Sequence, residues 1–383
     1  MNIVKFKNSP SGKLIKTKTD YWTFIPNPLP PEGLDTFSAD FVNILSEADR
    51  GIGALKSLSK LIPNPNLLIA PFVRKEAVQS SRIEGTQASL TDVFYYEASK
   101  EKPKDPDVLE VLNYVKAMNY GFSRIGKLPL SLRLVREIHQ KLIKGVRGDM
   151  LNPGEFRTTQ NWIGPQGCTL NDATYVPPPV DEMNKLLNQL EKFLYTEDPI
   201  APLVKCALIH YQFEAIHPFL DGNGRVGRLL ITFYLYQRGF LYYPILYLSD
   251  FFERHRDEYY DLLLGVSQSG DWEKWLKYFI RGVAEQSKAA EETGHDILNL
   301  QKNYRQLLQK ESVPTPVFKL LDMLFVNPMV SLNGISEFLE VTWPTAKASV
   351  EQLIKLGILK EISGRKRNRI YCAKELLNII AKD

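Results

Sequence analysis

The sequence predicts a mainly α-helical protein with one small β-hairpin and a C-terminal unit of three helices followed by two strands. Three observations support this fold class. Apolar residues recur at helical spacing through most of the first 310 residues. Within the first 300 residues, the segment 158–176 is the one clear strand-and-turn pattern. After residue 315 the pattern changes to short helical segments and then two alternating segments.

Helical spacing accounts for most of the chain up to about residue 310. A proline-rich start over 1–35 is expected to be extended, and the hairpin at 158–176 should be stopped by the three prolines at 177–179. The helices are expected over 37–61, 71–85, 107–125, 131–144, 180–195, 202–216, 227–238, 250–267 and 271–308.

The segment after a linker at 311–315 has its own order of elements. Helices are expected over 316–325, 332–339 and 343–356, and strands over 359–363 and 369–373. Three helices followed by a two-stranded wing resemble a winged helix-turn-helix, which is a DNA-binding shape. We therefore expect three regions: 1–100, a core over 101–300, and a winged-helix unit over 312–383.

Basic residues at the tip of this wing make DNA a candidate partner, because such side chains bind phosphates. They are Arg365, Lys366, Arg367 and Arg369. The recognition helix of the helix-turn-helix has four candidates for contacts with bases or phosphates: Thr342, Thr345, Lys347 and Ser349. Winged helices also dock proteins, and basic turns are often only solvated, so both interpretations stay open.

The composition is that of an ordinary globular protein of 383 residues with 44% hydrophobic and 24% charged residues. Its net charge of +4 is too small to predict nucleic-acid binding by the whole chain. The three cysteines have neither metal spacing nor a disulfide framework, which favours a reducing cytoplasm. The N-terminus lacks a signal-peptide pattern, and since no apolar run approaches bilayer-spanning length, we expect no membrane partner.

The run HPFLDGNGRVGR, from His217 to Arg228, is the most informative segment. Its residues Gly222, Asn223 and Gly224 can adopt backbone angles that direct successive N–H groups at one anion. A helix that starts just after them adds its free N–H groups and the positive end of its dipole. The segment therefore predicts a phosphate-binding loop.

Side chains of the same run add charge and a proton acceptor. Arg225 and Arg228 are three residues apart, so they should project from nearly one helix face, and their forks suit phosphate oxygens. Asp221 is a hard oxygen ligand for Mg²⁺, and His217 can act as a general base. The alternative is a surface loop with a core histidine and solvated arginines, but all these elements at one helix start favour a polyphosphate site.

This run matches the Fic family motif, H-P-F-x-[D/E]-G-N-G-R-x-x-R, at every defined position, and the resemblance extends from about residue 71 to 284. It implies a protein adenylyltransferase that uses ATP and Mg²⁺ to place AMP on a Tyr, Thr or Ser hydroxyl, its own chain included. His217 would take the hydroxyl proton, Asp221 would hold Mg²⁺ and Arg228 the γ-phosphate. The other nucleotide-binding residues implied are Gly222, Asn223, Gly224, Arg225, Val226 and Gly227.

A second segment resembles the family's inhibitory pattern, [S/T]-x-x-x-E-[G/N]. It contains Ser80, Glu84 and Gly85, and the first two share one helical face. Alone, the segment would be interpreted as an ordinary helix end. The resemblance implies that Glu84 pairs with Arg228 and occupies the place of the γ-phosphate, so that bound ATP is badly oriented.

Two further segments resemble parts of the family site. The hairpin, with Thr174 and Tyr175, resembles the flap whose strand edge pairs with a target, although it can equally be a structural cover. Tyr259 and Tyr260 resemble the pair near the adenosine, and at least one of them is expected to be core. A homodimer is also expected, since family members often self-associate.

The sequence leaves alternative functions open. Relatives of the same fold act as kinases, and these carry Lys where this chain has Gly224; others move phosphocholine. Removal of AMP by the same site, with Glu84 orienting a water, is a further alternative. Gly224 together with both arginines favours AMP transfer. In a different class, the winged helix would be the working part of a transcription regulator and the rest its sensor.

Overall fold

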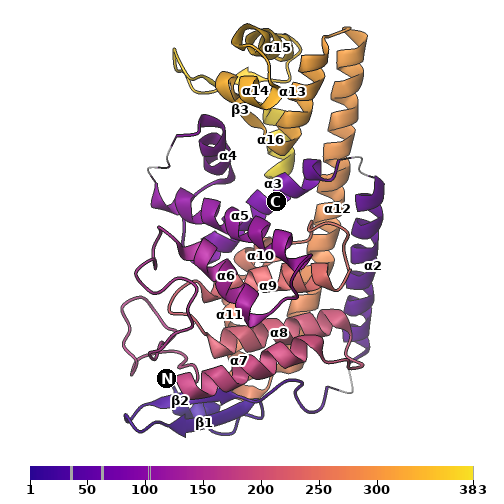
Figure 1. The fold of residues 1–383 in the computed structure, drawn as a ribbon. Helices are drawn as coiled ribbons and strands as arrows, with labels where there is room; N and C mark the ends of the chain where they lie inside the picture. Colours follow the sequence, from indigo (N-terminus) through magenta and orange to yellow (C-terminus); the bar gives the residue numbers. More distant parts are fainter. Residues whose placement is uncertain (35–37, 62–63, 102, 104, 383) are drawn as a thin grey trace.

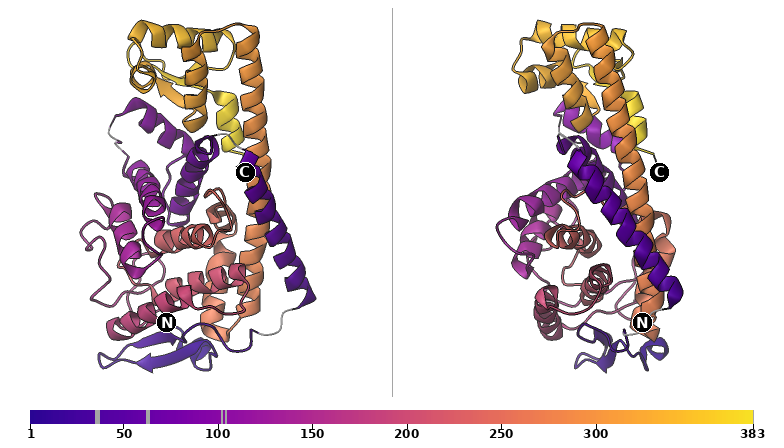
Figure 2. Two further views of the ribbon diagram at one scale, coloured as in Figure 1. Left: turned by 45° about the vertical axis from the view of Figure 1, so that its right-hand side comes forward. Right: turned by 90° about the vertical axis from the view of Figure 1, so that its right-hand side faces the viewer.

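The computed structural model describes the chain except for residues 35–37, 62–63, 102, 104 and 383. The molecule is elongated, and helix α12 (Trp272–Lys310) runs along one side of it (Figure 1). The two views in Figure 2 agree that α12 connects the part beside the N-terminal strands with the C-terminal unit. Helix α2 (Ala39–Leu61) packs along α12.

The described residues form sixteen helices and five strands. The remaining helices before α12 are α1 (Ile3–Phe6), α3 (Asn66–Ile83), α4 (Leu90–Ser99), α5 (Pro106–Ile125), α6 (Leu132–Ile143), α7 (Val180–Tyr195), α8 (Pro202–Ile216), α9 (Asn223–Gln237), α10 (Ser249–Arg254) and α11 (Arg256–Ser269). Strands β1 (Gly12–Lys16) and β2 (Trp22–Pro26) form an antiparallel pair.

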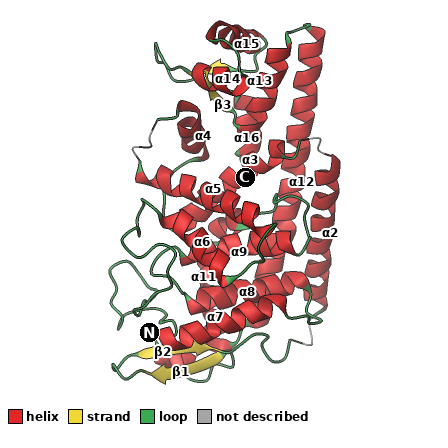
Figure 3. Cartoon of the chain, viewed as in Figure 1, coloured by secondary structure: helices red, strands yellow, loops and turns green. Residues whose placement is uncertain are grey.

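The C-terminal unit contains α13 (Thr315–Val326), β3 (Met329–Ser331), α14 (Leu332–Leu339), α15 (Trp343–Lys355), β4 (Lys360–Glu361), β5 (Ile370–Cys372) and α16 (Lys374–Ile380). Its three strands form an antiparallel sheet in the order β3-β5-β4. The strands of the described chain therefore lie at its two ends, with helices between them (Figure 3).

Helix starts follow from local side-chain chemistry. Ser89 begins α4 with a capping box, because its hydroxyl accepts from the Asp92 N–H while the Asp92 carboxylate accepts from the Ser89 N–H. Asp105 caps α5 just before a proline at the first helical position, and Ser131 caps α6. These caps satisfy N–H groups that lack partners within each helix.

The mainly α-helical fold class is confirmed, and α7, α8 and α14 have the predicted bounds. The predicted helix 250–267 is divided at His255 into α10 and α11, and α9 begins four residues earlier than expected. Helices α4 and α16 and strand β3 were not predicted. The expected start of the first long helix at Phe37 lies outside the described residues.

The hairpin is not where the sequence predicted it. The segment 1–35, expected to be merely extended, contains β1 and β2, whereas 158–176 forms a loop with a single bridge between Ile163 and Tyr175. The reason is a competing partner: the Val176 carbonyl accepts a hydrogen bond from the Phe24 N–H of β2 (3.0 Å). The end of the expected flap is thus hydrogen-bonded to β2 of the N-terminal sheet.

Helix α8 lies at the centre of the helical body, with thirteen of its fifteen residues buried. The fully buried Trp275 of α12 packs against His210 of α8, and its indole N–H donates to the Ala207 carbonyl (3.1 Å). Because α8 is surrounded on all sides, its C-terminal end is held in a fixed place. That end carries His217.

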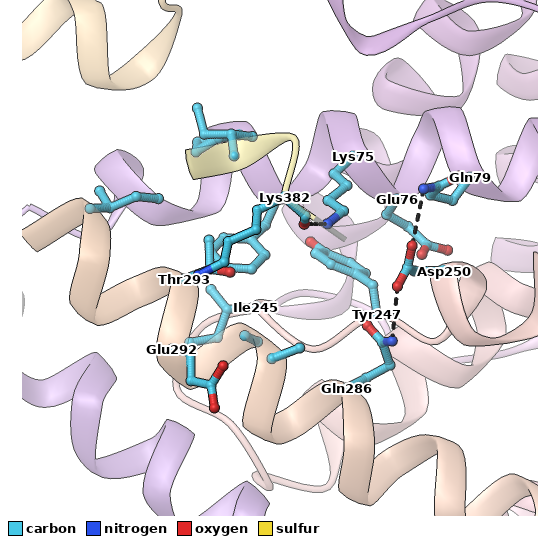
Figure 4. Close-up of a pocket in the computed structure, with 16 residues that line it drawn as sticks. Lys75, Glu76, Gln79, Ile245, Tyr247, Asp250, Gln286, Glu292, Thr293 and Lys382 are labelled. Carbon is cyan, nitrogen blue, oxygen red and sulfur yellow. Dashed lines mark hydrogen bonds between the residues drawn. The ribbon is translucent and has the colours of Figure 1, made fainter. Parts of the chain in front are cut away.

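The C-terminal unit packs onto α3 and α4. The Asn327 amide donates to Glu97 (3.3 Å), which also accepts from Arg74 of α3 (2.6 Å). A small cavity lies between α3, α12 and the end of α16, and Lys75 donates to the Lys382 carbonyl at its rim (Figure 4). Helix α3 is therefore held by α4 through Arg74 and by the C-terminal unit through Lys75.

None of the helices in the described part of the chain has both the length and the apolar character needed to cross a bilayer.

A matched pair of glycine substitutions tests the packing of α5 on α9. Gly121 faces the Phe233 ring, and a methyl group there would lie 2.2 Å from a ring carbon, whereas Gly53 of α2 has open space. We expect Gly121→Ala to lower the free energy of unfolding by about 1–3 kcal/mol. Gly53→Ala should raise it by about 0.5–1 kcal/mol through helix propensity. Urea unfolding midpoints measure both, and equal effects of the two would contradict this packing.

Candidate functional site

A cavity of about 780 Å³ lies where the C-terminal end of α8, the N-terminal end of α9, helix α11 and the loop 162–175 meet. Glu84, at the C-terminal end of α3, completes its wall. His217, Gly224 and Arg228 all line this cavity. The structure thus brings three parts of the 217–228 segment and the Ser80–Glu84 segment to one place.

Buried side chains hold the loop between α8 and α9. The Asn161 amide donates to the carbonyls of His217 (3.1 Å) and Phe219 (2.8 Å), and Arg157 also donates to the His217 carbonyl (3.0 Å). The fully buried Phe219 ring stacks on His139 at 3.8 Å. Sequence reasoning did not identify Asn161 or Arg157, because their partners are backbone carbonyls about 60 residues away.

His217 occupies a left-handed backbone conformation at the end of α8, with φ +50°. Its Nδ1 lies 3.2 Å from the Glu214 carbonyl, so the Nδ1–H donates there and Nε2 keeps its lone pair. Burial lowers the pKa of His217 to about 4, although the hydrogen bond to Glu214 opposes this shift. At neutral pH the imidazole is therefore uncharged and able to accept a proton.

The N-terminal end of α9 forms the predicted anion cradle. Gly222 precedes the helix with φ +80°, which glycine adopts without a steric penalty. The first hydrogen bond of the helix runs from the Val226 N–H to the Gly222 carbonyl (3.0 Å), so the N–H groups before it are oriented outward at the helix start. Asn223 is tied back to Phe219 by two hydrogen bonds of 2.8 Å, which fixes the turn.

Arg225 does not direct its side chain at the cavity, contrary to expectation. Its guanidinium is fully buried, 2.9 Å from Glu110 of α5 and 3.5 Å from Asp221. The two arginines of the motif therefore diverge instead of sharing one face. Val226 also faces away, since its side chain is fully buried, and the Gly227 carbonyl lies 3.1 Å from His210 Nδ1. Only their backbones belong to the helix start.

Asp221 directly precedes Gly222 in the loop, and a quarter of its side chain is exposed. Its Oδ1 accepts the Gly222 N–H (2.6 Å), and its Oδ2 lies 3.8 Å from Arg147. No cluster of three or more His, Cys, Asp or Glu side chains suited to a metal occurs among the described residues. A single carboxylate beside a phosphate cradle still fits Mg²⁺, which takes few protein ligands and binds mainly phosphates and water.

Glu84 and Arg228 form an ion pair in the wall of the cavity, where Glu84 Oε1 lies 2.7 Å from Arg228 Nη2. Arg228 is almost fully buried and also donates to the hydroxyl and the carbonyl of Ser80, both at 2.8 Å. Burial alone would raise the pKa of Glu84, but the charge and hydrogen bond of Arg228 outweigh it and hold that pKa below its ordinary value. Gly85 follows with φ +99°, as expected of a helix C-cap.

The Glu84 carboxylate lies directly over the start of α9. A methyl group on Gly224 would sit 2.3 Å from Glu84 Oε1, so this glycine leaves the space that the carboxylate fills. An anion bound at the helix start and at Arg228 would need part of the same space. The geometry therefore sets Glu84 in direct competition with a phosphate group.

The two tyrosines and the flap residues differ in their access to the cavity. Tyr259 is buried and its hydroxyl is 2.8 Å from His210 Nε2, whereas Tyr260 is 39% exposed. Tyr175 is buried with its hydroxyl on the Ala215 carbonyl (2.9 Å), and Thr174 is exposed at the cavity mouth. Tyr260 and Thr174 are thus the members of this set with surface open to a ligand.

Two models of one protein family match consecutive parts of this chain. The chain matches the model "Fic/DOC family N-terminal" over residues 42–123 and the model "Fic/DOC family" over residues 129–235, the latter containing the loop and the cradle. The chain belongs to the Fic family.

Among the relatives, "Protein adenylyltransferase Fic" of Drosophila grimshawi is 32% identical over 179 residues, and that of Aedes aegypti is 32% identical over 180 residues. Both matches cover 46% of this chain, but they span only 32% of the relatives' length. The chain therefore corresponds to about a third of each relative.

Two solved structures share the fold. A Fic family protein from Desulfovibrio desulfuricans has a TM-score of 0.56 at 20% identity, covering 88% of this chain and 97% of its own. Fic-1 from C. elegans has a TM-score of 0.50 at 22% identity, covering 69% and 74% respectively. At these identities the likeness concerns the fold alone.

The buried Arg225–Glu110 pair should dominate the stability of the cradle. Glu110→Ala leaves a fully buried guanidinium without its main partner, so we expect it to lower the free energy of unfolding by about 3–5 kcal/mol. The control is Lys185→Ala, which breaks an exposed pair with Glu182 and should cost less than about 1 kcal/mol. Denaturant midpoints of both variants give the comparison, and a Glu110→Ala cost as small as the control would contradict the pairing.

Proposed function

We propose that the protein is a Mg²⁺-dependent protein adenylyltransferase that transfers AMP from ATP to a side-chain hydroxyl of a protein. One observation carries this proposal: a neutral histidine, a helix N-terminus and a buried arginine line a single cavity. The names of the curated relatives support the same reaction. Among the family's phosphate chemistries, Gly224 favours AMP transfer, since kinase relatives carry Lys at that position.

In the proposed reaction the hydroxyl oxygen of the target attacks the α-phosphorus of ATP. His217 Nε2 takes the hydroxyl proton, because its Nδ1–H is already committed to the Glu214 carbonyl. The bond from the α-phosphorus to the bridging oxygen breaks, and pyrophosphate leaves. The cradle at the start of α9 holds phosphate oxygens through backbone N–H groups, and Arg228 holds the terminal phosphate.

Asp221 is the residue that would hold Mg²⁺ in this scheme, through the carboxylate oxygen nearer Arg147. The ion supplies charge neutralisation on the phosphates when it is bound. Arg225 contributes through position: its contacts with Glu110 and Asp221 fix the carboxylate beside the cradle. We assign Arg225 this positioning role in place of direct phosphate binding.

Glu84 acts as a brake in the proposed function. Its carboxylate satisfies Arg228 and fills the space over Gly224, so ATP cannot place its terminal phosphate there while the pair is intact. The reacting phosphorus is then displaced, and a displacement of about 1 Å costs about a hundredfold in rate. The signal that moves Glu84 would have to offset a buried, hydrogen-bonded ion pair.

The target is proposed to bind along the loop 162–175 above His217. Trp162 is 42% exposed there, and Thr174 is exposed beside it. The exposed loop edge offers backbone groups to an extended target segment, which brings a Tyr, Thr or Ser hydroxyl over the cavity. A second copy of this chain belongs among the proposed targets, and self-association would favour that modification.

Releasing Arg228 should activate transfer. We expect Glu84→Gly to raise the rate of AMP incorporation about a hundredfold, and Glu84→Gln, which keeps an acceptor but loses the charge, to give an intermediate rate. Intact mass after incubation with ATP and Mg²⁺ measures incorporation into the chain itself or an added target. Glu84→Gly/His217→Ala is the chemical control and should stay unmodified. A phosphate-sized mass gain, or equal rates for wild type and Glu84→Gly, would overturn this assignment.

The wing tip carries a second proposed function, contact with DNA phosphates. Lys366, Arg367 and Arg369 are exposed between β4 and β5, whereas Arg365 is bound to Glu101 at 2.7 Å. On α15 the Ser349 hydroxyl is turned onto the Thr345 carbonyl, so it is not free to contact bases. These contacts favour backbone binding by the wing over sequence reading by the helix.

Salt dependence tests this second function. Each phosphate contact contributes about 0.9 to the slope of log affinity against log salt concentration, so Lys366→Ala/Arg367→Ala should reduce the slope by about two. Binding of the full chain to a labelled duplex at several salt concentrations gives the slope, with Lys185→Ala as a control for a distant surface charge. An unchanged slope in the double variant would exclude the wing as the DNA contact.

A further inference from the structure

A second carboxyl group lines the cavity in addition to that of Glu84. Glu214 of α8 stands three residues before His217 and lines the same cavity. Its Oε1 is buried and has no hydrogen-bond partner within the described part of the chain. Leaving a buried carboxyl oxygen unpaired costs free energy, so a ligand group that hydrogen-bonds to this carboxyl would offset that cost.

Two glycines of α9 make room for the two carboxyl groups. A methyl group on Gly227 would lie 2.1 Å from Glu214 Oε1, as one on Gly224 would lie 2.3 Å from Glu84 Oε1. The two glycines are three residues apart and therefore lie on one face of the helix. Arg228 follows Gly227 directly, and its Nη1 is buried without a partner. The Glu84 carboxylate pairs with the arginine that is proposed to hold the terminal phosphate, and the charges of both groups act on the Glu214 carboxyl.

Several charged or titratable groups face Glu214 from the surrounding elements. They are Arg228 of α9, Glu84 after α3, Tyr259 of α11 and His210 of α8, whereas His217 contacts the backbone carbonyl of Glu214. Burial raises the pKa of Glu214 to about 8, with Arg228 opposing and Glu84 adding to the shift. The group is therefore a neutral carboxylic acid at pH 7, and its O–H is a hydrogen-bond donor.

We propose that Glu214 is a nucleotide-binding residue whose carboxylic acid donates a hydrogen bond to the terminal phosphate group of ATP. This inference rests on the proposed function, since it assigns a further residue to the same nucleotide. An ionised Glu214 would repel the triphosphate at short range, whereas the protonated form contributes a donor next to Arg228. ATP binding therefore requires Glu214 to hold its proton.

The proton requirement fixes the sign of the pH dependence. Bound triphosphate raises the pKa of Glu214 above its value in the free protein, so affinity is full below the free-state pKa and falls as pH rises through it. Removing Glu84 takes away a charge that raises this pKa, so the fall begins at lower pH in Glu84→Gly than in wild type. Above the free-state pKa, affinity falls about tenfold per pH unit until the bound form also ionises.

Calorimetric titration with Mg²⁺ and a non-hydrolysable ATP analogue tests the proposal. The titrations compare Glu84→Gly with Glu84→Gly/Glu214→Gln at pH 7, 8 and 9, because glutamine keeps a donor and cannot ionise. We expect the affinity of Glu84→Gly to fall at least tenfold over this range and that of the double variant to change less than about threefold. Any titration of the nucleotide itself is common to both proteins and cancels in the comparison.

A matched control is Asp257→Asn, which removes an exposed carboxylate from the same cavity. In the Glu84→Gly background it should keep the full pH dependence. Proton uptake is the second readout: at pH 8, Glu84→Gly should take up a fraction of a proton on binding, as seen from titrations in buffers of different ionisation heat. The Glu84→Gly/Glu214→Gln protein should take up at least severalfold less.

The outcomes distinguish a failure of the role proposed for Glu214 from a failure of the proposed function. Equal pH slopes with and without Glu214 would overturn the role of Glu214 while leaving nucleotide binding intact. Loss of binding by the double variant at pH 7, with an unchanged thermal unfolding midpoint, would also overturn it, since the glutamine keeps the donor. No nucleotide binding by Glu84→Gly at any pH would overturn the proposed function itself.

Discussion

The buried guanidinium of Arg228 is the group on which the arrangement of the site depends. A buried charge requires a partner of opposite charge, and Arg228 obtains one from Glu84 together with two hydrogen bonds to Ser80. The same guanidinium stands beside the start of α9, where an anion would bind. One cation therefore serves either the protein's own carboxylate or a phosphate, and the two cannot occupy the space over Gly224 together.

The location of α3 decides which partner Arg228 has, because Ser80 and Glu84 belong to its C-terminal end. The rest of α3 is held by other parts of the chain: Arg74 contacts Glu97, which is also bound by Asn327 of the C-terminal unit. Next to Ser80, Gln79 donates to Asp250, which accepts from Gln286 of α12 as well (Figure 4). The ion pair is thus built on a helix that contacts the C-terminal unit directly and is linked to α12 through Asp250.

Sequence reasoning found the parts of the site that depend on local pattern. The loop 217–222, the helix after it, and the Ser80–Glu84 spacing are all readable within a few residues, and the family motif adds their partners. It did not predict the direction of Arg225, because Glu110 lies on another helix, 115 residues earlier in the chain. Glu214 carried no signal at all, since a glutamate on a helix is usually solvated. The hairpin prediction missed for a similar reason: Val176 pairs with Phe24, which is distant in sequence.

The most direct test of the shared arginine compares the affinities of ATP and ADP at pH 7 by calorimetry. The two ligands differ by the phosphate that Arg228 is proposed to hold. We expect a ratio near one in wild type, a preference for ATP of at least about tenfold in Glu84→Gly, and a return toward one in Glu84→Gly/Arg228→Ala. A wild-type preference for ATP as strong as that of Glu84→Gly would show that Glu84 and the terminal phosphate do not compete for Arg228.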